Sequence, residues 1–278
     1  MKKIKIPIII FIFLITICVI NIHALSKELE VNYYHTSSAD IKNAIRICQI
    51  SDLHDYNYGN NQDELIKAIN DSNSDLILLT GDIFDETKTN HNVFKLIDGI
   101  KGHQNIYYVT GNHEYRISNL YQLLGKLEDN NVNVLHNESV ELLIKGNNIT
   151  ISGMDDSINF QMETWINKLN NISDSMKKSN YNILLSHRPN YIEHYKNSNF
   201  DLTLSGHNHG GQFRLPFGNV GLISPQGMFP KYTSGFYAAG DNKLFVSRGL
   251  SKSWMPRIFN RPELCIIDIN PAIKNIKA

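Results

Sequence analysis

The sequence predicts an α/β domain built on either one large mixed sheet or two stacked sheets. From about Ala44 onward, short apolar runs alternate with amphipathic stretches, which is typical of parallel strands covered by helices. After about Val132 several strands follow one another with only turn-like gaps, which indicates an antiparallel portion. The sequence contains no internal repeat, low-complexity tract or linker, so we expect one domain over residues 26–278.

The first half of this domain is expected to alternate strand and helix. Apolar runs bounded by polar turns predict the strands, and the spacing of Leu65, Ile66 and Ile69 is typical of one helix face. The expected strands of this half are 44–51, 75–80 and 105–110, and the expected helices are 63–70, 93–100 and 117–127.

The second half is expected to be richer in strands. Gly, Pro and aromatic residues crowd residues 206–240, where we expect long surface loops. One helix is expected at 162–169, and the expected strands are 132–135, 140–145, 149–152, 182–186, 202–205, 244–247 and 263–269.

Charge and composition exclude several classes of protein. The 27 basic and 27 acidic side chains cancel, so the chain cannot hold nucleic acid mainly by charge. A hydrophobic fraction of 42% is enough for a core and argues against disorder. Cys18, Cys48 and Cys265 are too few for a disulfide framework, although Cys48 and Cys265 fit either buried thiols or one disulfide.

Residues 1–25 differ from the rest of the chain. Residues 6–22 form an almost wholly apolar stretch behind Lys2, Lys3 and Lys5, and as a helix it would be about 25 Å long. We expect a single-pass membrane anchor with the domain on the extracytoplasmic side. The alternative is a cleaved signal, which would release a secreted protein. Without these three lysines the domain keeps 24 basic and 27 acidic residues and a formal charge of −3, so we expect no nucleic-acid partner.

Polar motifs follow five of the expected strands, at the point where each strand ends. Open α/β sheets bind ligands beyond the carboxyl ends of their strands, so these turns should converge. They contain Ser51-Asp52-Leu53-His54, Gly81-Asp82, Gly111-Asn112-His113-Glu114, Ser186-His187-Arg188 and Gly206-His207-Asn208-His209.

The donor atoms in these turns predict a two-metal site. Nitrogen and oxygen donors without thiolate suit Mn, Fe or Zn, and seven ligands are too many for one ion. Two ions about 3.5–4 Å apart, bridged by a carboxylate, would use all of them. The seven expected ligands are Asp52, His54, Asp82, Asn112, His187, His207 and His209.

This series of motifs resembles the calcineurin-like metallophosphoesterase superfamily. The resemblance runs from Asp52 to His209 and implies a four-layer α/β/β/α sandwich of two mixed sheets, with the two metals at one edge. The N-terminal apolar segment and Gly210-Gly211-Gln212 are similar to a bacterial membrane-anchored branch. Ser251 departs from that branch, in which glycine is expected after Gly249-Leu250.

The resemblance also implies a role for each residue. Asp52, His54 and His209 match the ligands of the first metal, and Asp82 matches the bridging carboxylate. His113 matches the non-ligand histidine beside the scissile bond, and Asp85 matches the carboxylate that orients it. The ligands of the second metal are matched by Asn112, His187 and His207.

The expected reaction is dimetal-dependent hydrolysis of a phosphodiester or phosphomonoester by a monomer at the outer face of the membrane. A lipid or a cell-wall precursor is the expected kind of substrate, and Arg188 and Arg214 are candidates to contact its phosphate. Two alternatives stay open, a non-catalytic metal-binding module and a pyrophosphatase for a nucleotide-linked lipid or sugar.

Overall fold

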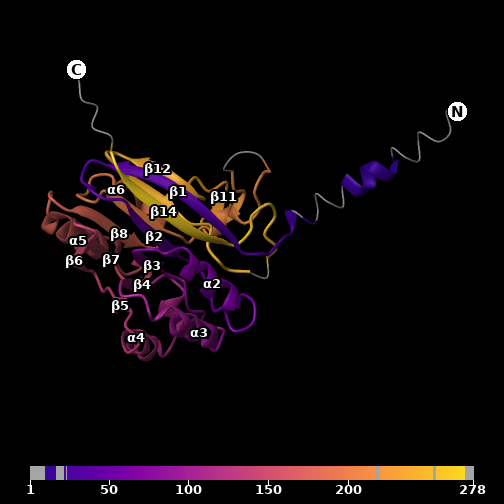
Figure 1. Ribbon diagram of the computed structural model, residues 1–278, viewed down its shortest axis with the longest axis horizontal. Helices are drawn as coiled ribbons and strands as arrows, with labels where there is room; N and C mark the ends of the chain where they lie inside the picture. The colour runs from indigo at the N-terminus through magenta and orange to yellow at the C-terminus, as the bar shows by residue number, and fades with distance from the viewer. Residues whose placement is uncertain (1–9, 17–21, 23, 217–219, 253–254, 273–278) are drawn as a thin grey trace, which may run out of the picture.

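Two six-stranded sheets packed face to face form the centre of the molecule (Figure 1). The computed structural model describes residues 10–16, 22, 24–216, 220–252 and 255–272. In spatial order, the first sheet contains β1 (Glu30–Ser38), β14 (Glu263–Pro271), β2 (Ile45–Ile50), β3 (Leu76–Thr80), β4 (Ile106–Val109) and β5 (Asn133–Val134). The second contains β12 (Gly235–Ala239), β13 (Asn242–Val246), β9 (Leu202–Ser205), β8 (Tyr181–Ser186), β7 (Asn147–Met154) and β6 (Glu138–Ile144).

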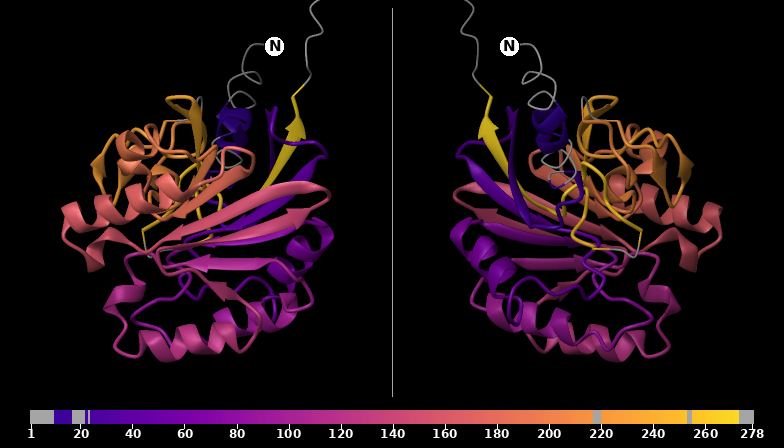
Figure 2. Two further views of the ribbon diagram at one scale, coloured as in Figure 1. Left: turned by 90° about the vertical axis from the view of Figure 1, so that its left-hand side faces the viewer. Right: turned by 90° about the vertical axis from the view of Figure 1, so that its right-hand side faces the viewer.

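Helices cover the outer face of each sheet, which makes four layers (Figure 2). The first sheet is covered by α2 (Asp63–Asp71), α3 (His91–Ile100) and α4 (Leu120–Glu128). The second is covered by α5 (Met162–Ser175) and α6 (Ile192–Tyr195). The expected α/β/β/α sandwich of two mixed sheets is therefore confirmed.

Alternation along the central strands produces these layers. In β3, Leu78 packs into the core between the sheets, whereas Ile77 and Leu79 pack against the helices. In β8, Ile183 faces the core between the sheets and Leu184 faces α5 and α6. Because successive side chains point to opposite faces, a strand covered on both sides is apolar throughout, as these strands are.

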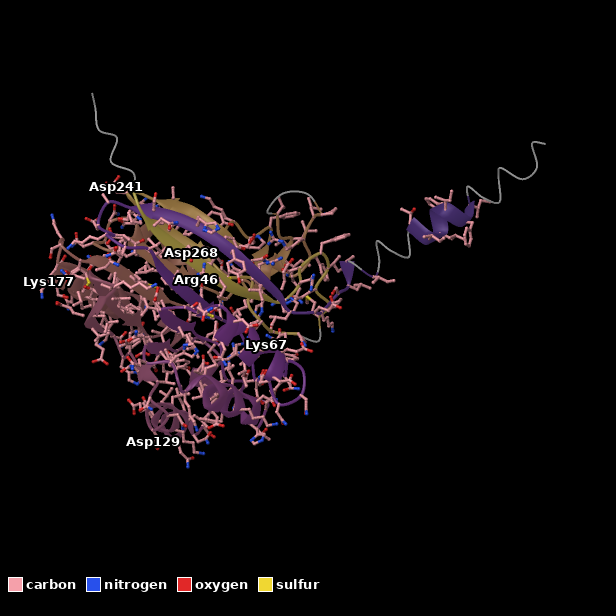
Figure 3. The ribbon with its side chains drawn as sticks, in the orientation of Figure 1. Arg46, Lys67, Asp129, Lys177, Asp241 and Asp268 are labelled. Carbon is pink, nitrogen blue, oxygen red and sulfur yellow. The ribbon has the colours of Figure 1, made fainter. Side chains whose placement is uncertain are left out.

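Strand directions bring five turns to one edge of the sandwich. β2, β3 and β4 are parallel to one another, and so are β7, β8, β9 and β13. β14 runs antiparallel to β2, and its Asp268 lies opposite Arg46. The Arg46 guanidinium donates two hydrogen bonds, of 2.7 and 3.0 Å, to the Asp268 carboxylate (Figure 3).

The structure differs from the expectation in several elements. β1 was not expected, because none of its nine side chains is fully buried and its sequence EVNYYHTSS has no apolar run. The expected loops of residues 206–240 contain β12 and the short hairpin of β10 (Ile223–Ser224) and β11 (Gly227–Met228). Only β6 and β7 form the expected antiparallel run, since β7 pairs in parallel with β8.

The N-terminal expectation is only partly covered by the structure. Of the predicted membrane segment, residues 10–16 and 22 are described and the others are not. No helix formed by the described residues is long and apolar enough to cross a membrane. Cys48 and Cys265 are buried free thiols.

Candidate metal centre

The expected ligands lie in turns that follow β2, β3, β4, β8 and β9. Asp52 and His54 follow β2, Asp82 follows β3 and Asn112 follows β4, so the first sheet supplies four of them. The second sheet supplies His187 after β8, and His207 and His209 after β9.

One group of donors surrounds Asp52. The ligand atoms of Asp52, His54 and His209 lie within 4.8 Å of one another. His209 Nε2 is 3.7 Å from Asp52 Oδ1, and the rings of His54 and His209 stack with centroids 5.3 Å apart. The backbone N–H of His207 donates to both oxygens of Asp52, which fixes the carboxylate across the gap between the two sheets.

A second group surrounds Asp82. The ligand atoms of Asp82, His187 and His207 also lie within 4.8 Å of one another. His187 Nε2 is 3.1 Å from Asp82 Oδ2, and His54 Nε2 is 3.8 Å from the same oxygen. Asp82 Oδ2 therefore faces donors of both groups, which is the position that a bridging carboxylate needs.

The backbone of this site is held in unusual conformations. Asp52, His54, Asp82, His207 and His209 all have positive φ angles, between 46° and 70°. Non-glycine residues seldom adopt this region, and such strain concentrates at functional sites. Two glycines allow the close packing, since a Cβ on Gly111 would lie 2.3 Å from Asp82 Oδ1 and one on Gly206 would lie 2.2 Å from Asp52 Oδ2.

The donor set fits two divalent metal ions. His54 Nε2 and Asn112 Oδ1 are buried atoms with no hydrogen-bond partner among the described residues. Because a buried polar atom without a partner costs free energy, these two atoms indicate a missing ligand. The Nδ1–H of His187 donates to the Thr80 carbonyl over 2.8 Å, which leaves Nε2 directed at the site.

The electrostatics agree with metal binding. Burial lowers the pKa of His54 to about 4 and that of His209 to about 3, so both imidazoles are neutral, as metal ligands must be. Burial also acts on His187, but the Asp82 carboxylate raises the pKa of this imidazole to about 10. Burial would by itself raise the pKa of Asp82, yet His187 holds it well below its usual value. Asp82 is therefore ionised, and a metal cation could replace the charge of protonated His187 as its partner.

His113 lies beside the two groups, with a different partner from the one expected. Its Nε2 is 4.0 Å from Asp82 Oδ2, and its ring meets that of His54 edge to face at 4.5 Å. Its Nδ1 lies 2.5 Å from Glu86 Oε2. Oδ1 of Asp85, the expected orienting carboxylate, accepts the backbone N–H and the hydroxyl of Thr87. Its Oδ2 lies 3.7 Å from His54 Nδ1, and the ligand atoms of His54, Asp85 and His113 lie within 4.8 Å of one another.

The two arginines that were candidates for substrate contact have different positions. Arg188 is partly exposed and gives Nε and Nη2 to the Asp156 carboxylate, while its Nη1 lies 3.5 Å from His207 Nε2. Arg214 is buried and donates to the Gly210 carbonyl over 2.7 Å. The expectation that Arg214 contacts substrate is therefore corrected, because its guanidinium is used to hold the loop after His209.

Sequence reasoning missed Glu114, which organises the turns of β3 and β4. This buried carboxylate accepts four backbone N–H groups, from Asp82 at 3.0 Å, Ile83 at 2.8 Å, Phe84 at 3.0 Å and Gly111 at 2.7 Å. The sequence did contain a signal for it, because Glu114 directly follows Asn112 and His113. An acidic side chain in such a motif needs hydrogen-bond donors or a cation as partners.

Sequence reasoning also missed the surroundings of His209. Its Nδ1 lies 2.8 Å from Ser251 Oγ, which leaves Nε2 for the site. Arg257, whose side chain is buried, donates to the same hydroxyl at 3.3 Å. Ser251 was noted as a departure from the expected glycine, and this contact gives the departure a structural reason.

Two hollows open beside Glu86. One has a volume of about 670 Å³ and is lined in part by Tyr56, Glu86 and Lys88. The other, of about 460 Å³, is lined in part by Asp85, Glu86 and Arg116.

Comparison with known proteins gives consistent matches. A family model described as calcineurin-like phosphoesterase matches residues 45–211. An uncharacterized metallophosphoesterase of Campylobacter jejuni is 31% identical over 251 residues, covering 87% of this chain and 64% of that protein. The uncharacterized metallophosphoesterase YkoQ of Bacillus subtilis is 28% identical over 257 residues, covering 86% of this chain and 90% of YkoQ. The solved NAD nucleotidase of Haemophilus influenzae, 18% identical, has a TM-score of 0.51 over 76% of this chain and 46% of its own, which supports the fold alone.

Proposed function

The chain belongs to the calcineurin-like phosphoesterase family, and we propose that it hydrolyses phosphoester bonds with two divalent transition-metal ions. The observation that carries this proposal is the convergence of two donor groups on Asp82 Oδ2. Nitrogen and carboxylate donors in this arrangement suit Mn, Fe or Zn. Bound there, the ions would act as Lewis acids on the phosphoryl oxygens and make water a stronger nucleophile.

The surrounding side chains would orient the substrate and move one proton. The attacking water would lose one proton to solvent, its oxygen would form a bond to phosphorus, and the bond from phosphorus to the leaving oxygen would break. His113 would give its Nε2 proton to that leaving oxygen, since Glu86 accepts a hydrogen bond on the opposite nitrogen. The Nη1 group of Arg188 lies beside His207 and can donate to a phosphoryl oxygen while Asp156 holds the rest of the guanidinium.

We also propose that the N-terminal segment anchors the protein and that the catalytic domain is extracytoplasmic. The apolar stretch of residues 6–22 behind three lysines supports this orientation. A substrate at the membrane or in the cell wall would agree with such an anchor.

The test is hydrolysis by the full chain in detergent, stripped of metal and then supplied with Mn²⁺. Bis-p-nitrophenyl phosphate, p-nitrophenyl phosphate and a nucleotide sugar distinguish the diesterase, monoesterase and pyrophosphatase reactions. We expect Asp82→Asn to lower kcat/KM about 10³-fold, because a bridging carboxylate holds both ions. Asp98→Asn, on the exposed face of α3, is the matched control and should leave the rate unchanged.

A second candidate function is that of a non-catalytic metal-binding module. It would be favoured by two ions bound per chain, measured by elemental analysis, with no turnover of any of the three substrates. Equal activity of Asp82→Asn and the wild type would contradict the proposed site altogether.

A further inference from the structure

We infer that the hairpin β10–β11 docks on the lipid bilayer and that the metal centre consequently faces the membrane surface. The inference rests on the proposed N-terminal anchor, and it does not require the phosphoesterase activity. Three features carry it: the place where the N-terminal segment joins the domain, the exposed apolar residues where β11 ends, and the attachment of both to the edge that holds the metal ligands.

Strand register places the start of the domain at the metal edge. Glu30, the first residue of β1, lies opposite Glu263, the first residue of β14. β14 is antiparallel to β2, so its first residues lie beside the last residues of β2, with Cys265 opposite Gln49. β2 leads directly into Asp52. The chain therefore enters the sheet at the same edge from which the ligand turns project.

Backbone contacts fix the residues just before β1 near this edge. The carbonyl of Ala24 accepts the backbone N–H of Phe259 at 2.8 Å. The neighbouring residue Ile258 accepts the N–H of Arg214 at 2.9 Å, within the loop that begins at His209. The N-terminal segment thus ends against the loop of residues 255–261, which in turn holds the segment that leads to the hairpin.

The hairpin presents apolar side chains where β11 ends, at the open end of the hairpin and not at its turn. Met228 is 73% exposed, Phe229 is 67% exposed, and Leu215 and Val220 in the same loop are also exposed. Residues 215–230 contain no Asp, Glu, Lys or Arg. Gln226 donates to Asn190 at 2.9 Å, two residues after Arg188, which ties the hairpin to the turn that follows His187. Figure 1 shows β11 and the indigo N-terminal chain at the same end of the domain.

A lipid surface is the partner that this arrangement fits. Isolated exposed apolar side chains are ordinary, but a long charge-free loop that exposes several of them is typical of an interaction site. Leu25, at the end of the N-terminal segment, is also an exposed apolar residue. An anchor of this kind keeps the bilayer within reach of the hairpin, and burial of Met228 and Phe229 in the lipid would fix the tilt of the domain.

Docking in this orientation would select the substrate by its location. The turns that hold Asp52, Asp82 and His207 would face the lipid head groups, so phosphoesters carried by membrane lipids would reach the metals more readily than soluble ones. This consequence, unlike the docking, depends on the proposed phosphoesterase function.

The test is photolabelling of the full chain in vesicles of phosphatidylcholine that contain a trace of a photoactivatable phosphatidylcholine. Uncharged lipid ensures that apolar contact, and not charge, is measured. Mass spectrometry should find lipid on the peptide that contains Met228 and Phe229 as well as on the N-terminal segment. Asp82→Asn should label equally, which separates docking from catalysis.

A matched pair of variants tests the role of the apolar residues at the end of β11. Leu143 on β6 is 74% exposed, like Met228, but it lies opposite Asn148 near the start of β7, at the end of the sandwich away from the metals. Met228→Asp should lower labelling of the hairpin about tenfold, since one buried methionine is worth roughly that factor. Leu143→Asp should not alter it. Labelling of the N-terminal segment alone would overturn the docking and leave the anchor intact, whereas labelling of neither would overturn both.

Discussion

At the residue scale, the contact between His113 and Glu86 bears on the proton transfer proposed for His113. With Glu86 Oε2 at 2.5 Å from Nδ1, the Nε2 nitrogen of His113 is directed at the donor groups. Burial would raise the pKa of Glu86, but the hydrogen bond with His113 lowers it below its usual value, so the carboxylate is ionised. Glu86 is therefore a positioning residue that acts through His113.

We predict that Glu86→Gln lowers kcat about tenfold on a phosphodiester with an alkyl leaving group. The loss should be much smaller with a p-nitrophenyl leaving group, because nitrophenolate departs without a proton. Asp85→Asn is the control, since its side-chain oxygen can still accept from Thr87. Steady-state kinetics with both substrates, together with metal content, measure the effect.

A larger loss of kcat in Asp85→Asn than in Glu86→Gln would show that Asp85, and not Glu86, orients His113. An equal loss of kcat with both leaving groups would contradict proton transfer by His113.

Single residues also show where sequence reasoning reaches its limit. The seven donors were located from strand ends alone, because the chemistry of a metal site restricts which residue types can serve. Arg214 could not be judged in this way, since an arginine beside a ligand has the same sequence signal whether it meets substrate or a buried carbonyl. The choice between Asp85 and Glu86 depended on side-chain direction within one turn, which the sequence does not record.

At the element scale, the turns after β3 and β4 are held together by one carboxylate. Glu114, in the 3-10 turn Glu114–Arg116, accepts N–H groups from both turns and keeps Asp82 and Asn112 in place. These N–H groups are buried, so no water can replace the carboxylate. Desolvation and the charge of Asp82 raise the pKa of Glu114 to about 7, which shows how strongly this position is enclosed.

We predict that Glu114→Ala lowers the free energy of unfolding by at least about 3 kcal/mol, because it leaves several buried donors unpaired. Urea denaturation of the metal-free protein measures this loss without a contribution from metal binding. Glu128→Ala, at the exposed end of α4, should stay within about 0.5 kcal/mol of the wild type. A Glu114→Ala protein as stable as Glu128→Ala would show that water reaches these turns.

The elements that sequence reasoning missed share a physical cause. The central strands β3 and β8 are buried on both faces and read as apolar runs, so they were found. β1 lies at an edge of its sheet, pairs only with β14 and mixes exposed with partly buried positions, so its pattern is weak. β7 pairs in parallel with β8, although α5 separates the two strands in the sequence. The short gaps between β5, β6 and β7 favoured antiparallel neighbours instead, so the parallel pairing was not predicted.

At the scale of the whole molecule, the candidate metal centre connects the two sheets. Asp52, Asp82 and Asn112 come from the first sheet, and His187, His207 and His209 come from the second. Ions bound by both sets would therefore cross-link the two halves of the sandwich at one edge. At the opposite edge, Lys145, which follows β6 of the second sheet, forms an ion pair of 2.8 Å with Asp75, which precedes β3 of the first.

Removal of the metals should therefore destabilise the fold as well as abolish activity. Binding to the native state alone adds about 2.7 kcal/mol at a free metal concentration of 100 times Kd for each site, so Tm should rise with the metal concentration. Differential scanning calorimetry of chelated and reloaded protein measures the shift, and hydrogen exchange should show that chelation exposes the turns after β3 and β9 together. His207→Ala should reduce the shift, because it removes a donor from the second sheet, whereas His103→Ala, in the exposed turn after α3, should preserve it. Chelation that removes both ions yet leaves Tm and exchange unchanged would mean that the ions do not join the sheets.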